Sequence, residues 1–344
     1  MRRPKHLNMP RSQHGLSLVE LMIALLLGLL ITAAATQMLL TTKNAYRMQD
    51  DISRLQENGR FAVELLSHDI RMAGYMGCAN ISRLDINIIA KNASDWDDLN
   101  SSNFLLGYDN VTVGNSVGAK AGSDYIQIRG ASGGGVRLYP ELTDNANIQI
   151  KGNPYGFEAN DVLMVTDCVS ADIFRATNVS TQGNNNDKVT IAHTEKVNTA
   201  NRLSKLYGPD AEIMFFRMVT YYVKPSETGS GDALWMKLQG ADTDPSTALD
   251  VEIVDGVENL QIEYGVDTNG DRAANEYRAA NNISDWSRVV SVRFSLLMAG
   301  NGTDTINTSG NFSQSINYNG AAVTKDGKLR SVFENLVAIR NRVP

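Results

Sequence analysis

The polar and apolar positions divide the chain into a helical part and a part rich in strands. Residues 21–42 contain no charged side chain. At about 1.5 Å of rise per helical residue they form roughly 33 Å of helix, which is long enough to cross a bilayer core. From Asn44 to Ala73 apolar residues recur every three, four or seven positions, so the helix is expected to continue as an amphipathic one. Its apolar stripe consists of Ala45, Met48, Ile52, Leu55, Ala62, Leu66, Ile70 and Ala73.

Glycines are expected to end this helix, and short alternating runs follow it. Gly74 and Gly77 supply the positive φ that a helix C-cap uses. Beyond Cys78 the runs are separated by Asn, Gly, Ser and Asp, which predicts an antiparallel, β-rich domain. The strands are expected at 124–129, 147–151, 162–166, 173–179, 188–193, 213–223, 233–238, 251–254, 259–266, 289–299 and 330–339. Residues 300–327, rich in Gly, Asn, Ser and Thr, are expected to form a long mobile loop.

The first 15 residues have the character of a targeting leader. They carry Arg2, Arg3, Lys5 and Arg11 and no acidic residue, which keeps this segment on the cytoplasmic side while the rest is exported. The end of the apolar run, residues 39–43, lacks the Ala-x-Ala site of an ordinary secretory signal. The other candidate cut follows Gly15, and it leaves the apolar segment attached to the mature chain.

One carboxylate, Glu20, stands directly before the uncharged run. An ionised group at a membrane boundary is costly unless another group compensates it, so this residue is a functional hypothesis.

The stretch from Gly15 to Met22, GLSLVELM, is similar to the type III signal of type IV prepilins and type II secretion pseudopilins. The resemblance implies that a prepilin peptidase cuts between Gly15 and Leu16 and N-methylates Leu16. The family usually has Phe where this chain has Leu16. Glu20 is then fifth in the mature chain, where the family's Glu is thought to meet the terminal amine of a neighbouring subunit. In a buried pair of this kind, losing one partner costs roughly 3–5 kcal/mol.

Further stretches resemble the PilW-type minor pilins of type IV pili: residues 56–62, 69–78, 257–267, 288–294 and 338–342. The resemblance implies an α+β, pilin-like fold in which a long N-terminal helix packs on an antiparallel β-rich domain. It also implies a low-abundance subunit that primes pilus assembly near the tip and supports twitching motility, adhesion and DNA uptake. The implied partners are other minor pilins, the major pilin, prepilin peptidase, a tip adhesin and the inner-membrane assembly platform.

The expected organisation follows from these segments. Residues 1–15 are the removed leader, 16–42 the transmembrane and filament-core helix, 43–77 the amphipathic helix, and 78–344 a periplasmic domain. The protein is expected to span the inner membrane once and later to reach the cell surface in the pilus. Two alternatives stay open: a minor pseudopilin of a type II secretion system, and a membrane-anchored binding protein that never polymerises.

Composition narrows the chemistry. The chain has 32 Lys and Arg against 38 Asp and Glu, and losing the basic leader makes it more acidic, which argues against direct binding of nucleic acid. Only His68 and His193 remain after the leader, which excludes a site with three His and makes an enzyme a poor hypothesis. Cys78 and Cys168 are the only cysteines. In an exported chain an even count favours a disulfide, the alternative being two separate buried thiols.

Two loops are candidate ligand sites, and no cofactor other than Ca²⁺ is expected. Asp267, Asn269, Asp271 and Glu276 place oxygen atoms in a spacing that could hold Ca²⁺. Arg272 stands where an EF-hand has Gly, and the alternative is a polar hairpin turn. The glycine-rich residues 130–135 lack the Lys-Ser/Thr of a phosphate loop and are expected to form a flexible turn.

Overall fold

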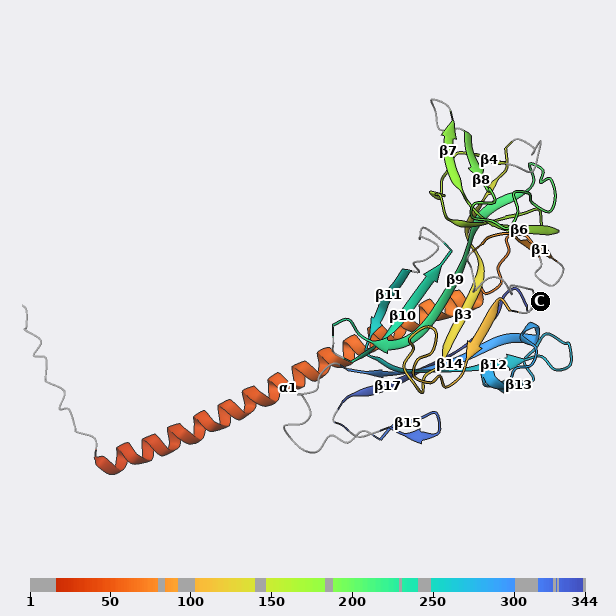
Figure 1. Ribbon diagram of the computed structural model, residues 1–344. Coiled ribbons are helices and arrows are strands. Elements are labelled where there is room, and N and C mark those ends of the chain that lie inside the picture. Colours follow the sequence, from red (N-terminus) through yellow and green to blue (C-terminus); the bar gives the residue numbers. More distant parts are fainter. Residues whose placement is uncertain are drawn as a thin grey trace, which may run out of the picture. The chain divides into compact units, whose positions relative to one another are not determined.

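The computed structural model describes residues 17–79, 84–91, 103–139, 147–182, 188–228, 231–240, 249–300, 315–323, 326 and 328–342. These residues form a long helix, α1 (Leu18–Arg71), the short 3-10 helices η1 (Ala280–Asn282) and η2 (Trp286–Arg288), and the strands β1 to β17 (Figure 1). The chain divides into two compact units, residues 1–50 and 51–344. Helix α1 therefore has one segment in each unit.

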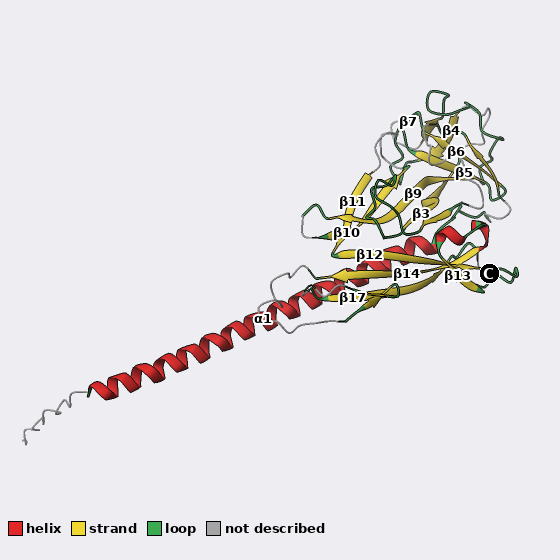
Figure 2. Cartoon of the chain, turned by 60° about the horizontal axis from the view of Figure 1, so that its bottom comes forward, coloured by secondary structure: helices red, strands yellow, loops and turns green. Residues whose placement is uncertain are grey.

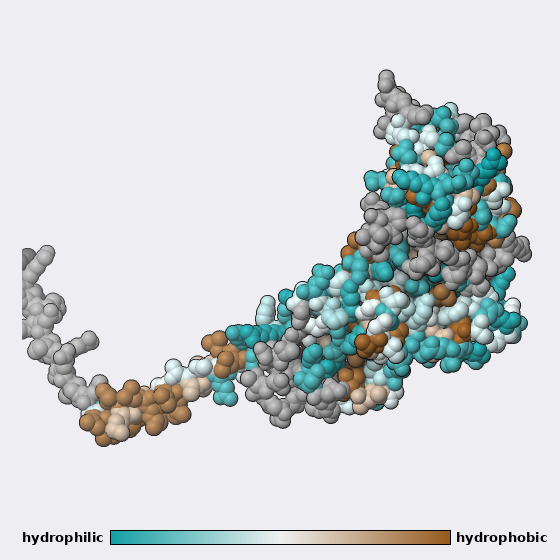
Figure 3. All heavy atoms as spheres, in the orientation of Figure 1, coloured by the Kyte–Doolittle hydropathy of each residue, from teal (hydrophilic) through white to brown (hydrophobic). Residues whose placement is uncertain are grey.

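The first unit exposes apolar side chains along its whole helical segment. Leu29 is 71% exposed and Ile31 is 69% exposed, and Figure 3 shows this segment as a largely brown, apolar surface. The most apolar stretch is long enough to cross a membrane, and none of it is buried within the described chain. Such a surface needs hydrocarbon or other apolar helices around it.

In the second unit one stripe of α1 is buried, at Leu55, Gly59, Ala62, Leu66 and Ile70. The stripe predicted from the sequence is confirmed from Leu55 onwards. Before that residue, Ile52 is half-buried and Ala45, in the first unit, is exposed.

The helix ends at Arg71, two residues before the predicted end. The residues that follow form hydrogen bonds to a strand that is distant in the sequence. Gly74, with φ +66°, turns the backbone. Its N–H donates to the carbonyl of Arg129 at 2.9 Å, and the next carbonyl, of Tyr75, accepts from Ala131 at 2.7 Å. A Cβ on Gly130 would lie 3.2 Å from the Tyr75 nitrogen, so this close approach favours glycine there.

The largest sheet has the order β1-β6-β5-β9-β10-β11, with β3 pairing β9 and β2 pairing β3. Strand β9 forms its centre because its sequence is apolar on both faces. The pairs are antiparallel except for β1 and β6, which are parallel. The strands are β1 (Asp85–Ile88), β2 (Leu105–Tyr108), β3 (Tyr125–Arg137), β5 (Val162–Thr166), β6 (Ser170–Arg175), β9 (Glu212–Pro225), β10 (Asp232–Gln239) and β11 (Leu249–Asp255).

A four-stranded antiparallel sheet packs one face on α1. Its order is β13-β12-β14-β17, from β12 (Val257–Val266), β13 (Glu276–Arg278), β14 (Val289–Ala299) and β17 (Arg330–Ala338). Leu260, Phe294 and Leu296 share a core with Leu66 and Ile70 of the helix, and Figure 2 shows these strands running beside that part of α1. Because side chains alternate along a strand, the intervening residues face away from the helix.

A smaller sheet shares a hydrophobic core with part of the largest sheet. It joins β4 (Asn147–Lys151), β8 (Lys188–Ala192) and β7 (Asn178–Gln182), in that order. Ile148, Ile191 and Phe174 are among the buried side chains that pack beneath it.

Part of the predicted 300–327 loop is ordered, so that prediction is wrong there. Strands β15 (Asn317–Tyr318) and β16 (Ala321–Ala322) form a hairpin. Tyr318 is only 9% exposed, and its hydroxyl donates to the Ser295 carbonyl at 2.7 Å. One buried aromatic anchors a segment that looked like a polar loop. Residues 301–314 lie outside the described part of the chain.

Three other expectations are corrected. Residues 130–135 lie inside β3, with a register shift between Ser132 and Val136, instead of forming a turn. The single strand expected at 173–179 is split between β6 and β7. Strands β1, β2 and β13 were missed, the first two in a stretch whose polar sequence predicts no regular structure.

Candidate functional site

Glu20 lies in the first turn of α1, and it forms a capping box with Ser17. The Ser17 N–H donates to Glu20 Oε2 at 3.2 Å, and the Glu20 N–H donates to Ser17 Oγ at 3.2 Å. These bonds satisfy two backbone donors that a helix N-terminus would otherwise leave unpaired. The predicted cleavage residues Gly15 and Leu16 lie outside the described residues.

The capping box was not among the predicted features, although the Ser-x-x-Glu spacing is its signature. The arrangement places a carboxylate at the positive end of the helix dipole, which favours its charge. Directly beyond it the chain offers only apolar side chains such as Leu21 and Ile23, which are 52% and 54% exposed.

Four hydroxyl groups of the apolar segment are hydrogen-bonded within the helix. The hydroxyls of Thr32, Thr36, Thr41 and Thr42 each donate to the carbonyl four residues earlier. These four donors are thereby kept from hydrocarbon, where an unpaired polar group is costly. Glu20 stands at the start of the segment.

Cys78 and Cys168 form the predicted disulfide, with their Cα atoms 5.1 Å apart. Cys78 follows the end of α1, and Cys168, at φ +72°, lies in the turn between β5 and β6. The bond therefore connects the chain just beyond the helix to the largest sheet.

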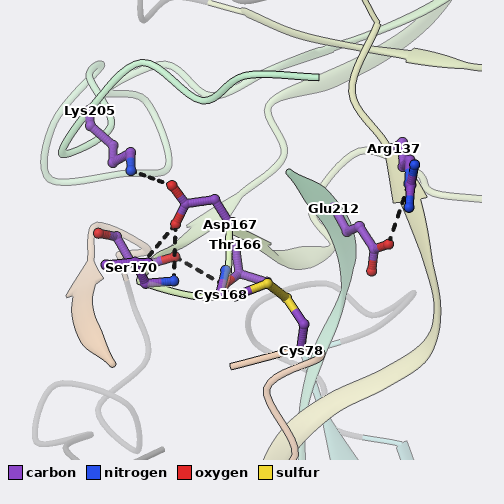
Figure 4. The surroundings of a disulfide bond; sticks show 9 residues. Cys78, Arg137, Thr166, Asp167, Cys168, Ser170, Lys205 and Glu212 are labelled. Atoms are coloured by element: carbon purple, nitrogen blue, oxygen red, sulfur yellow. Dashed lines mark hydrogen bonds and ion pairs between the residues drawn. A yellow bond between two sulfur atoms is a disulfide. The ribbon is translucent and has the colours of Figure 1, made fainter. Parts of the chain in front are cut away.

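Polar contacts shape the turn that carries Cys168 (Figure 4). Asp167 accepts from the N–H of Ser170 at 2.9 Å and from the ammonium group of Lys205. Burial alone would raise the pKa of Asp167, but the bonds from Lys205, Ser170 and Val169 outweigh it and lower this pKa. The turn thus holds an ionised carboxylate next to the disulfide.

The loop considered for calcium joins β12 to β13, so the polar hairpin turn is observed. Asp267 accepts from the backbone N–H groups of Asn269, Gly270 and Arg272 at 3.1, 2.6 and 2.8 Å. Desolvation alone would raise the pKa of Asp267, but these N–H groups together outweigh it and lower this pKa. Glu276 does not join them, because its carboxylate pairs with Arg278. The Asp267 oxygens that would bind Ca²⁺ already accept hydrogen bonds within the loop. Binding of Ca²⁺ to this loop stays an untested hypothesis.

The two histidines that follow the leader lie in different surroundings. His68 is exposed and lies 2.9 Å from Asp69. His193 is buried beside Phe174, and neither of its ring nitrogens has a hydrogen-bond partner. Burial lowers the pKa of His193, so it is neutral at pH 7. Among the described residues no three His, Cys, Asp or Glu side chains converge on a metal site.

One buried polar cluster had no sequence signal. Asp172, fully buried, accepts from the hydroxyl of Tyr207 at 2.7 Å and from the N–H and hydroxyl of Ser204 at 2.9 and 2.6 Å. Burial and the Asp172 charge raise the pKa of Tyr207 well above its usual range. The cluster is satisfied internally, which indicates a structural role.

Comparisons with known proteins agree with the N-terminal geometry. Residues 220–341 match the family of type IV pilus-assembly protein W, and residues 10–36 match the prokaryotic N-terminal methylation motif. Among solved structures, a type IV-like pilin from Thermus thermophilus is similar at 12% identity and a TM-score of 0.35, covering 85% of this chain and 98% of that one. A similarity at that level does not support a conclusion about this chain. A comparison with curated proteins finds no match.

The methylation motif contains Gly15, Leu16 and Glu20, and the C-terminal match contains β12, β14 and β17. A long apolar N-terminal helix leads into a β-rich, disulfide-linked domain. Residues 220–341 are therefore similar to the type IV pilus-assembly protein W family, and the N-terminus is similar to the prokaryotic N-terminal methylation motif.

Proposed function

We propose that this chain is a minor pilin that primes assembly of a type IV pilus and stays near its tip. Prepilin peptidase would cut after Gly15 and methylate Leu16, leaving the subunit in the inner membrane with its C-terminal domain in the periplasm. The role is structural and non-catalytic. Twitching motility, adhesion and DNA uptake would depend on it through the pilus, and its partners would be other pilins, the assembly platform and a tip adhesin.

The observation that carries the proposal is the position of Glu20. A single carboxylate stands at the first turn of a helix whose following side chains are apolar and uncovered. In a filament core this carboxylate would meet the terminal ammonium group of a neighbouring subunit, since each charge offsets the other's desolvation. An unmatched buried charge there costs roughly 3–5 kcal/mol, which is enough to exclude a subunit in the wrong register.

Glu20→Gln tests this role more sharply than Glu20→Ala. A capping box accepts Gln in place of Glu, so this variant keeps the helix cap and loses only the charge. We expect Glu20→Gln to reach the inner membrane at the level of the unaltered protein but to be absent from sheared, purified pili. The matched control is Glu57→Gln, which removes an exposed carboxylate from the same helix. If Glu20→Gln enters pili as well as the control does, the proposed pairing is wrong.

A further inference from the structure

Strand β17 is the last strand of the four-stranded sheet (Figure 2), and no strand of the described residues pairs with its outer edge. The Ile339 N–H donates to the Val290 carbonyl at 2.9 Å, and the Gly300 N–H donates to the Leu329 carbonyl at 2.9 Å. The register between these bonds is unbroken. Bonding alternates along an antiparallel pair, so odd-numbered residues of β17 bond to β14. The backbone groups of Val332, Glu334, Leu336 and Ala338 therefore point outwards.

These outward groups have almost no partners within the described part of the chain. The one bond found is local, from the Leu336 N–H to the Asn335 side-chain oxygen at 3.0 Å. Proteins usually protect an edge strand with Pro, a bulge or charged side chains, Lys above all. The nine residues of β17 contain no Pro, Lys or bulge. Their charged side chains are Glu334 and Arg330, and Arg330 is paired with Glu258 and Asp326. An edge of this kind is a template for a strand from another chain.

The side chains beside the open edge alternate in character. Val332, Glu334 and Leu336 face away from the helix, and Leu336 is 54% exposed. Among the described residues, no Lys or Arg lies within ion-pair distance of Glu334. Facing side chains of adjacent strands lie about 4.5–5.5 Å apart, so an added strand would place its own side chains against this apolar, acidic, apolar series.

The hollow next to Glu334 is lined by more acidic than basic side chains. Glu334 lines a hollow of about 490 Å³ together with Asp109, Asp124 and Glu263, and the one base in the lining is Arg293. That base is already paired, since its guanidinium lies 3.1 Å from Glu263. A long basic side chain opposite Glu334 would therefore lie at the mouth of a hollow with excess negative charge.

We propose that the outer edge of β17 binds an extended segment of a partner protein whose side chains are apolar, basic and apolar at alternate positions, with the basic residue opposite Glu334. Main-chain hydrogen bonds to Glu334 and its outward neighbours would supply the affinity. The charge of Glu334 and the exposed Leu336 would set the register. The inference goes beyond the proposed function, because it holds whether or not the chain enters a filament.

A peptide probe tests this directly on the full chain in detergent. The probe is a blocked ten-residue peptide with the central sequence Val-Thr-Lys-Thr-Val, and its matched control has Glu in place of Lys. We expect saturable binding of the Lys peptide, with amide exchange slowed at Val332, Glu334 and Ala338 and unchanged at Phe333 and Val337. The Glu peptide should bind about tenfold more weakly, because like charges then face each other.

Two variants separate the edge from the charge. Glu334→Gln should bring the affinities of the two peptides to within about threefold of each other. Glu334→Pro removes an outward N–H without cutting a bond to β14, so it should abolish binding; a Lys peptide N-methylated on its pairing face does the same without altering the protein. Absence of saturable binding, equal binding of the two peptides to the unaltered chain, or protection at β11 instead of β17 would overturn the proposal.

Discussion

Gly59 sets how closely α1 approaches the sheet, and replacing it with alanine should loosen that contact. An added Cβ would lie 2.7 Å from Cδ2 of Phe333 and closer still to Cε2 and Cζ of the same ring. Real Cβ atoms do not approach other heavy atoms so closely, so the ring or the helix must move. Overpacking of this kind costs about 1–3 kcal/mol, whereas Ala in place of Gly gains about 1 kcal/mol of helix propensity.

We therefore expect Gly59→Ala to lower the free energy of unfolding by up to about 2 kcal/mol. In the Phe333→Leu background the obstructing ring is gone, and the same substitution should be neutral or stabilising by up to about 1 kcal/mol. The two residues should thus couple by about 1–3 kcal/mol. Gly28→Ala is the matched control, because nothing lies within 4 Å of the Cβ it adds to the same helix.

Urea unfolding of the full chain in detergent measures this coupling, with tryptophan fluorescence as the signal. Trp286 reports on the relevant core, since its ring lies 4.8 Å from that of Tyr264 and packs on the cluster that includes α1. If Gly59→Ala stabilises the chain equally with and without the Phe333 ring, the close approach of helix and strand is wrong.

Three further predictions concern the covalent link, acid stability and the calcium hypothesis. Replacing Cys78 and Cys168 together with Ser should cost about 2–5 kcal/mol, because the bond closes a loop spanning 90 positions; an unchanged urea midpoint would contradict this. Because the pKa of His193 is lowered in the folded chain, His193 binds protons more readily when the chain is unfolded. Burial of neutral His193 therefore contributes fully to the free energy of unfolding above about pH 6.5, and this contribution falls as the pH drops below that value. His193→Phe should flatten the acid side of the stability curve relative to the unaltered protein. Asp124, whose pKa burial raises to about 6, acts in the opposite direction in both proteins. Finally, because Asp267 is already bonded within its loop, we expect the same Tm in millimolar calcium as in EDTA, and a rise in calcium that Asp271→Asn abolishes would establish the metal site.

The elements with strong local patterns were predictable from the sequence. The apolar run and the stripe from Leu55 to Ile70 predicted the helix, and strands such as β4, β5 and β14 begin and end at the predicted residues. The disulfide followed from an even cysteine count in an exported chain.

What the sequence could not show depends on contacts between distant residues. Gly59 looks like a weak point in a helix until Phe333 is placed against it. Residues 130–135 look like a turn until β9 pairs with the first three of them, and Tyr318 converts part of an apparent loop into a hairpin. The capping box of Ser17 and Glu20 is different, because the Ser-x-x-Glu spacing that indicates it is local in the sequence.

The proposed pairing of Glu20 requires removal of the basic leader, because only then does a neighbouring subunit present an ammonium group to this carboxylate. Intact-mass and N-terminal peptide mass spectrometry of the protein from its native membranes tests this most directly. The account predicts a chain that begins at N-methylated Leu16. A chain that still carries Arg2 and Arg3 would contradict it and would favour an anchored protein that never polymerises.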